Sequence, residues 1–130
     1  MLENIQIKNF ALIDSCSLDF TKGFTVLTGE TGAGKSILIG ALSFLLGGKA
    51  SVDQIRAGAN EALVSGTISV NPTCKEAFAW LEERAIDIED NSVLLRRIIK
   101  DSGKSGAWIQ NTPVTRTELA EFTSFLFDIH

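Results

Sequence analysis

The segment that most constrains the fold is LTGETGAGKSILIG, residues 27–40, in which glycines and a lysine separate two apolar runs. Gly29, Gly34, Lys35 and Ser36 fit the spacing G-x-x-x-x-G-K-S/T of phosphate-binding loops. Glycine lets a backbone adopt positive φ and approach a ligand closely, and successive amides then form a concave anion site. A helix that follows adds the partial positive charge of its N-terminus. The segment therefore predicts a strand, a phosphate-binding loop and a helix, in that order.

The loop predicts a nucleotide site for ATP with Mg²⁺. Lys35 is expected to reach the β- and γ-phosphates as a point charge, which makes it the one catalytic candidate, and the Ser36 hydroxyl is expected to bind Mg²⁺. The carboxylate of Glu30 is expected to point into solvent. The cofactor-binding candidates are Gly29, Glu30, Thr31, Gly32, Ala33, Gly34, Lys35 and Ser36. The alternative interpretation is a glycine-rich strand-to-helix turn that binds nothing.

Hydrophobic periodicity predicts the elements around the loop. The expected strands are an antiparallel pair within residues 1–20, then 24–28, 62–70, the hairpin 92–100 with 106–110, and 125–130. A helix is expected over 35–48, closed by Gly47 and Gly48 and apolar enough to be buried on more than one side. A second helix is expected over 71–85, with Asn71 as its N-cap. Thr115 and Glu118 have the spacing of a capping box.

Composition narrows the function classes further. No apolar run is long enough to cross a bilayer, and the N-terminus lacks a basic start and an apolar core, so we expect no membrane partner and a cytoplasmic location. The net charge of −4 gives no support for a nucleic-acid surface. Cys16 and Cys74 match no metal spacing, and Cys16 is expected to be a small apolar residue in a strand.

The chain resembles the RecN family of bacterial DNA repair proteins, in the SMC-like branch of the ABC ATPases. The residues that carry the resemblance are MLENIQIKNFALIDS, GFTVLTGETGAGKSILIGALSFLLGGKAS, IRAGANEALVSG, LLRRIIKDSGKSGAWIQNTPVT and FDIH. Residues 1–23, which precede the strand of the loop, also suit the mixed ATPase heads of this class. One departure is SGAWIQN, where relatives read approximately S-R-A-Y-I-N-G: Gly106 replaces an arginine, whose contact could have moved to Lys104.

The resemblance implies an α/β fold of the P-loop NTPase class: an ABC/SMC-type ATPase head, of which residues 1–130 would be the N-terminal lobe. An antiparallel β-subdomain would lie beside the nucleotide-binding core. A glutamine loop, a coiled coil and a C-terminal lobe with the signature motif and catalytic glutamate would follow, so the fragment alone should hydrolyse little ATP. The full-length protein would be an ATPase of double-strand-break repair and recombination, associated with the nucleoid, whose heads dimerise around ATP and control DNA binding or bridging.

Two other functions remain open from the sequence. One is a different SMC- or RecF-like ATPase of chromosome maintenance, and the other is a nucleotide-switched binding module with incidental hydrolysis.

Several further residues are only weak candidates for a functional site. Arg56 could lie near nucleotide or DNA, or be a plain surface arginine, and Asn9 and Phe10 could border the adenine, although Phe10 also suits a packed core.

The remaining candidates are a basic run and a histidine. Arg96, Arg97 and Lys100 form the basic run, which we expect to be a solvated strand face, with a phosphate contact as the alternative. His130, the only histidine, has no assigned role.

Overall fold

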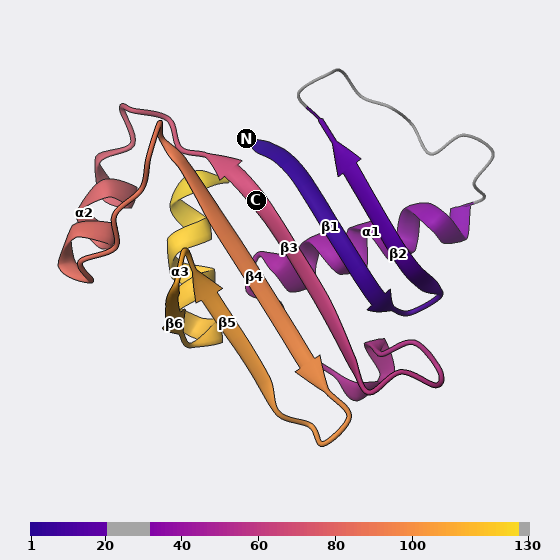
Figure 1. The fold of residues 1–130 in the computed structure, drawn as a ribbon. Coiled ribbons are helices and arrows are strands. Elements are labelled where there is room, and N and C mark those ends of the chain that lie inside the picture. The colour runs from indigo at the N-terminus through magenta and orange to yellow at the C-terminus, as the bar shows by residue number, and fades with distance from the viewer. Residues whose placement is uncertain (21–31, 128–130) are drawn as a thin grey trace.

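The computed structural model describes residues 1–20 and 32–127, with the backbone alone at residues 32–35. Its elements are β1 (Leu2–Phe10), β2 (Ile13–Asp19), α1 (Gly32–Leu45), the 3-10 helix η1 (Val52–Gln54), β3 (Glu61–Ser69), α2 (Lys75–Glu83), β4 (Ser92–Lys100), β5 (Ser105–Ile109), β6 (Thr112–Val114) and α3 (Arg116–Leu126). Figure 1 shows the strands as one twisted sheet, with α1 crossing behind it.

The sheet has six strands in the order β2-β1-β3-β4-β5-β6, and each neighbouring pair is antiparallel. Side chains alternate between its two faces. On one face Ile5, Ile7, Val64 and Leu95 are buried, whereas polar residues such as Gln6 are exposed on the other. This alternation is typical of an antiparallel sheet with one covered face.

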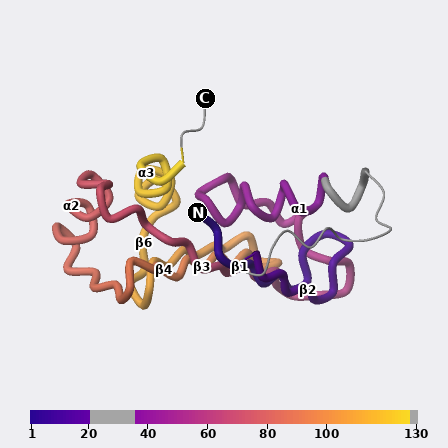
Figure 2. The backbone as a smooth tube through the Cα atoms, turned by 90° about the horizontal axis from the view of Figure 1, so that it is seen from above, coloured from indigo at the N-terminus to yellow at the C-terminus, as the bar shows by residue number. Residues whose placement is uncertain are grey.

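Figure 2 shows α1 and α3 on the same face of this sheet, with α2 beside α3 at one end. The α2–α3 contact includes the rings of Trp80 and Phe122, whose centroids lie 5.0 Å apart. Trp80 Nε1 also donates a hydrogen bond of 2.9 Å to Glu121. Helices α1 and α3 therefore cover one face of the sheet, α2 packs on α3 at the edge of this layer, and the core lies between the sheet and the helices.

Most of the predicted elements are confirmed. The first antiparallel pair, the strand near 62–70 and the hairpin of β4 and β5 are present. The capping box of α3 is present, because the Thr115 hydroxyl accepts from the Glu118 amide and the Glu118 carboxylate accepts from the Thr115 amide. The predicted strand 24–28 lies outside the described residues.

Several boundaries and elements differ from the prediction. Helix α2 begins at Lys75, because the Asn71 side chain accepts hydrogen bonds from the amide and hydroxyl of Thr73 and so stabilises a turn there instead of capping a helix. The predicted strand 125–130 is wrong at Phe125 and Leu126, since α3 continues to Leu126, and residues 128–130 of this prediction lie outside the described residues. The short elements η1 and β6 were not predicted.

Candidate functional site

The candidate site lies at the N-terminus of α1. This helix begins at Gly32, three residues earlier than the sequence predicted, so Gly32, Ala33, Gly34 and Lys35 form its first turn. Ser36 follows and is exposed. The other loop residues of the prediction, Gly29, Glu30 and Thr31, lie outside the described residues.

The electrostatics of the first turn suit an anion. The first turn of α1 contains no acidic residue, so no carboxylate on the helix itself opposes the partial positive charge of its amides. Figure 1 shows this end of α1 extending past β2 at the edge of the sheet, which leaves the helix N-terminus away from the packed centre. These features are compatible with an anion at the main-chain amides of the first turn.

Packing fixes α1 on the sheet by one side. Ala41, Phe44 and Leu45 are buried, with at most 1% of their surface exposed, and the Phe44 ring lies 5.9 Å from that of Phe10. Ile39, in contrast, is 67% exposed. The prediction that α1 is buried on more than one side is therefore wrong for the described residues, which cover one side only.

Three side chains bind the backbone at the C-terminal end of α1. Arg97 Nη1 donates to the carbonyl oxygens of Phe44 at 2.7 Å and Gly48 at 2.9 Å. Thr123 Oγ1 donates to the carbonyl of Leu46 at 2.7 Å, and Arg116 Nη1 donates to that of Gly47 at 3.3 Å. The carbonyls that a helix leaves unpaired at its C-terminus are thus satisfied by β4 and α3.

This arrangement corrects the predicted basic run. Arg97 is 1% exposed and lies within the core, whereas Arg96 and Lys100 are exposed on the opposite face. Because successive strand residues alternate between faces, the three residues cannot form one solvated patch. Burial, followed by the charge of Arg116, lowers the pKa of Arg97 to about 10, so Arg97 stays protonated at neutral pH.

Arg96 and the unusual SGAWIQN segment meet on the exposed face. The Arg96 guanidinium lies 4.6 Å from the centroid of the Trp108 ring, a cation–π contact. The same ring lies over Gly106, where a Cβ atom would be 2.6 Å from it. An arginine at position 106 would therefore displace Trp108. Lys104 is exposed in the loop before β5.

The weaker candidates have structural surroundings. Phe10 is 3% exposed and packs in the core, as the second of its two interpretations predicted. Asn9 has a positive φ of 54°, and its carbonyl accepts from the amide of Arg56 at 2.9 Å. The Arg56 side chain is 45% exposed and lies 3.9 Å from the Asp14 carboxylate, so it is a surface arginine beside the β1–β2 hairpin. His130 lies outside the described residues.

Cys16 and Cys74 are free thiols and form no disulfide with each other. Burial raises the pKa of the Cys16 thiol, which keeps it neutral and favours the packing role that was predicted. Cys74 donates a weak hydrogen bond of 3.4 Å to the Phe125 carbonyl. Among the described residues, no group of three or more metal-ligating side chains occurs, and no helix is long and apolar enough to cross a membrane.

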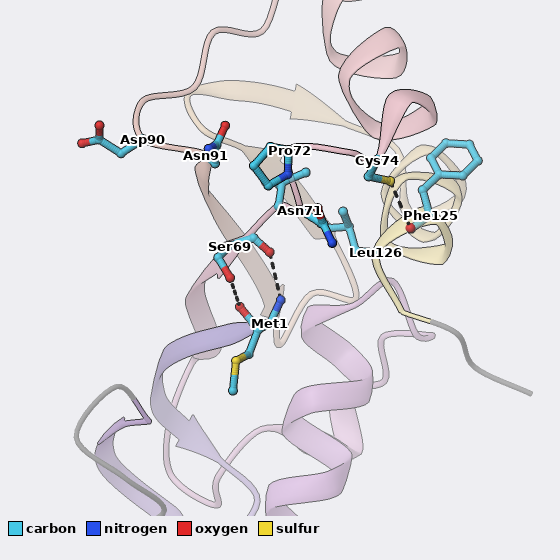
Figure 3. Close-up of a pocket in the computed structure, with 10 residues that line it drawn as sticks. Met1, Ser69, Asn71, Pro72, Cys74, Asp90, Asn91, Phe125 and Leu126 are labelled. Atoms are coloured by element: carbon cyan, nitrogen blue, oxygen red, sulfur yellow. Dashed lines mark hydrogen bonds between the residues drawn. The ribbon is translucent and has the colours of Figure 1, made fainter.

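One pocket of about 650 Å³ lies elsewhere, between the start of β1 and the C-terminal end of α3 (Figure 3). Its lining includes Met1, whose amine donates to the Ser69 carbonyl at 2.9 Å, and the Cys74 and Phe125 pair. Asp90 is the one acidic side chain among the described lining residues. The pocket holds no set of groups that would bind phosphate, so it is not the candidate site.

The fold and the placement of the motif define a class: the N-terminal lobe of an SMC-type ATPase head. A solved structure described as "Structural biochemistry of ATP-driven dimerization and DNA stimulated activation of SMC ATPases" matches 96% of this chain and 78% of its own, with a TM-score of 0.72 and 26% identity. The SMC head domain from Thermotoga maritima matches 92% of this chain and 41% of its own, with a TM-score of 0.67 and 21% identity.

The family follows from the sequence comparisons. The family model of the RecF/RecN/SMC N-terminal domain matches residues 1–128, so the chain belongs to this family. It is 48% identical over 130 residues to the DNA repair protein RecN of Treponema pallidum (strain Nichols), which covers all of this chain and 23% of that protein. The chain thus spans about a quarter of the length of this relative. The predicted resemblance to RecN and the predicted fold class are both confirmed.

Proposed function

We propose that this chain is the ATP-binding part of an SMC-like ATPase that acts in DNA double-strand-break repair and recombination. The observation that carries the proposal is the position of the motif: Gly34, Lys35 and Ser36 begin a helix that packs on the sheet of an SMC-type head fold. Sequence relatives, at up to 48% identity, are named as DNA repair proteins, which supports a role in DNA repair.

The roles of the residues follow from their chemistry. Main-chain amides from Gly29 to Ser36 would hold the phosphates, and Lys35 would neutralise charge on the β- and γ-phosphates. The Ser36 hydroxyl would hold Mg²⁺, which supplies Lewis-acid polarisation of the phosphoryl oxygens when it is bound. In this proposal residues 1–130 form an incomplete lobe, and the groups that activate water belong to sequence beyond residue 130. The chain alone would therefore hydrolyse ATP negligibly.

The partners of the full-length protein are part of the same proposal. Two heads would close around ATP to form a homodimer, and this pairing would control DNA binding or bridging in the nucleoid of the cytoplasm. The SMC structure described above was solved in the context of ATP-driven dimerization, which supports this expectation by analogy of fold.

The test is a titration of ATP–Mg²⁺ into the full-length protein and into a Lys35→Ala variant. Loss of a charge-assisted contact of about 1.5–3 kcal/mol should weaken binding by roughly 10- to 100-fold. Lys49→Ala is the matched control, because this exposed lysine follows the opposite end of α1 and should bind ATP like the wild type. Equal affinity of the Lys35→Ala variant and the wild type would refute the nucleotide site.

A further inference from the structure

Arg97 is a buried cation in the core of the described structure, and the proposed function assigns no role to it. It lies in the middle of β4 opposite Val64 and Ala107, two small neighbours that leave room for its side chain in the core. A buried charge is expensive unless it is paired. Among the described residues, however, the carboxylate ion pairs involve Arg56 and Arg84, and not Arg97.

The partner of Arg97 is instead the C-terminal end of α1. Nη1 donates to the carbonyls of Phe44 and Gly48, and the guanidinium lies 4.3 Å from the centroid of the Phe44 ring. The partial negative charge at a helix C-terminus stabilises a cation there. Nε has no hydrogen-bond partner among the described residues. The guanidinium is therefore held by one helix end, and it fixes that end in return.

The other end of the same helix carries the motif. Helix α1 spans Gly32–Leu45, 14 residues, and is about 21 Å long at 1.5 Å per residue. A helix of this length without proline moves as a rigid rod, so an axial shift or rotation at Phe44 appears also at Ser36. Because phosphate binding depends on where amides point, small displacements at the first turn would weaken it.

We propose that Arg97 is a positioning residue for the first turn of α1, residues 32–36: its hydrogen bonds to Phe44 and Gly48 set the axial position and rotation of the helix, and thereby the placement of the main-chain amides of this turn. This inference rests on the proposed nucleotide site. Thr123 and Arg116, which bind the carbonyls of Leu46 and Gly47, complete the same anchor from α3. Arg97 touches no nucleotide itself in this proposal.

A merely structural role predicts a different outcome from a positioning role. Arg97→Met removes a desolvated charge but also leaves the carbonyls of Phe44 and Gly48 without this donor, so its Tm should be lower than that of the wild type. Binding is therefore measured at a temperature at which the variant is folded. A positioning role requires that the folded variant binds nucleotide more weakly, whereas a purely structural role requires that the folded variant binds it like the wild type.

The experiment compares the full-length wild type with Arg97→Met and Arg97→Lys by ATP–Mg²⁺ titration and by hydrogen–deuterium exchange of the amides of residues 32–36. We expect the Kd of Arg97→Met to rise by about tenfold, with faster exchange at these amides. Arg97→Lys keeps the charge but lacks the forked donor, so its Kd should rise by about threefold.

Arg84→Met is the matched control. Arg84 also lies over an aromatic ring, 3.7 Å from the Trp80 centroid, and donates to a backbone carbonyl, that of Trp80. It joins α2 to α3 through Glu118, and its described polar and ring contacts all lie within these two helices, so its removal should leave ATP binding within twofold of the wild type.

The outcomes separate the two proposals. If Lys35→Ala binds ATP roughly 10- to 100-fold more weakly than the wild type, the nucleotide site stands. Arg97→Met and Arg97→Lys binding within twofold of the wild type would then overturn the positioning role alone. Should Arg97→Met fail to fold, the folded Arg97→Lys variant decides the question: a raised Kd with faster exchange at residues 32–36 supports the proposal, and wild-type values overturn it.

Discussion

Gly66 lies where β1, β3 and α1 approach one another most closely. In the middle of β3 it pairs with Ile5 of β1 and Leu95 of β4. A Cβ atom at this position would be 2.7 Å from the carbonyl oxygen of Asn4 and 2.9 Å from Cδ2 of Leu45. The leucine methyl can rotate away, but the Asn4 oxygen belongs to the backbone of β1 and is held by the sheet. Gly66→Ala must therefore separate β1 from β3.

The size of the effect follows from two opposing contributions. Alanine in a strand interior normally gains about 0.5–1 kcal/mol over glycine through the entropy of the unfolded chain. Overpacking a core contributes about 1–3 kcal/mol of destabilisation, and a backbone obstacle places this site in the upper part of that range. We expect a net loss of about 1–2 kcal/mol, which lowers Tm by roughly 3–10 °C for a domain of this size.

The assay is thermal unfolding of the 130-residue chain, followed by circular dichroism, with Gly40→Ala as the matched control. Gly40 lies inside α1, and the nearest atom to a Cβ there is Cε1 of Phe10 at an ordinary 3.8 Å. Since alanine is favoured over glycine in a helix by about 0.8–1 kcal/mol, Gly40→Ala should raise Tm. A Gly66→Ala variant at least as stable as the wild type would refute the reasoning.

Two further predictions concern the start of α3. Thr115→Ala should lower the free energy of unfolding of the 130-residue chain by about 1 kcal/mol in urea titrations, because the Glu118 amide loses its acceptor. The control is Thr117→Ala, on the exposed side of the same turn, which should not lower the free energy of unfolding. Equal effects of the two substitutions would contradict the capping box. The Thr115 amide, followed by the Arg84 side chain, lowers the pKa of Glu118, so the stability that its charge contributes is present above the unfolded pKa of about 4.3 and is lost as pH falls through the lower folded value. The Tm difference between the wild type and Glu118→Gln, which keeps the amide hydrogen bond, should therefore shrink between pH 7 and pH 3, and a constant difference would argue against this linkage.

The individual strands could be predicted from the sequence because the signals for them are local. Alternation of apolar and polar residues identified β1, β3 and the β4–β5 hairpin, and the hydrogen bonds of an antiparallel pair connect segments that are close in sequence. The capping box at Thr115 is likewise a pattern of four residues. The pairing of β1 with β3 could not be predicted, because it depends on segments about 60 residues apart.

The start of α2 and the end of α3 were mistaken for the same kind of reason. Asn71 and Pro72 are favourable at a helix start, but the Asn71 side chain accepts hydrogen bonds from the amide and the hydroxyl of Thr73 in a turn, and such local side-chain bonds compete with helix capping. Phe125 and Leu126 suit a strand by propensity, yet they belong to α3, which packs its apolar side against the sheet and α2.

The burial of Arg97 was missed in the sequence analysis, which placed this residue on a solvated face, although a signal was present. In β4 it has the same parity as Val93, Leu95 and Ile99, all of which are buried, so period-two alternation places it on the core face. A solvated face was predicted instead, because a charged side chain is seldom buried. Its partners at the end of α1 could not be inferred, since nothing in the sequence relates residue 97 to residues 44 and 48.

The strand order has a consequence for synthesis of the chain. β1 can pair with β2 as soon as both have been synthesised, but the partner of its other edge is β3, which ends at Ser69. At translation rates of about 5–20 residues per second, the interval between the end of β2 and the end of β3 lasts roughly 3–10 seconds. During that time the apolar residues Ile5 and Ile7 belong to a nascent hairpin with an open edge, the kind of surface that recruits chaperones or other nascent strands.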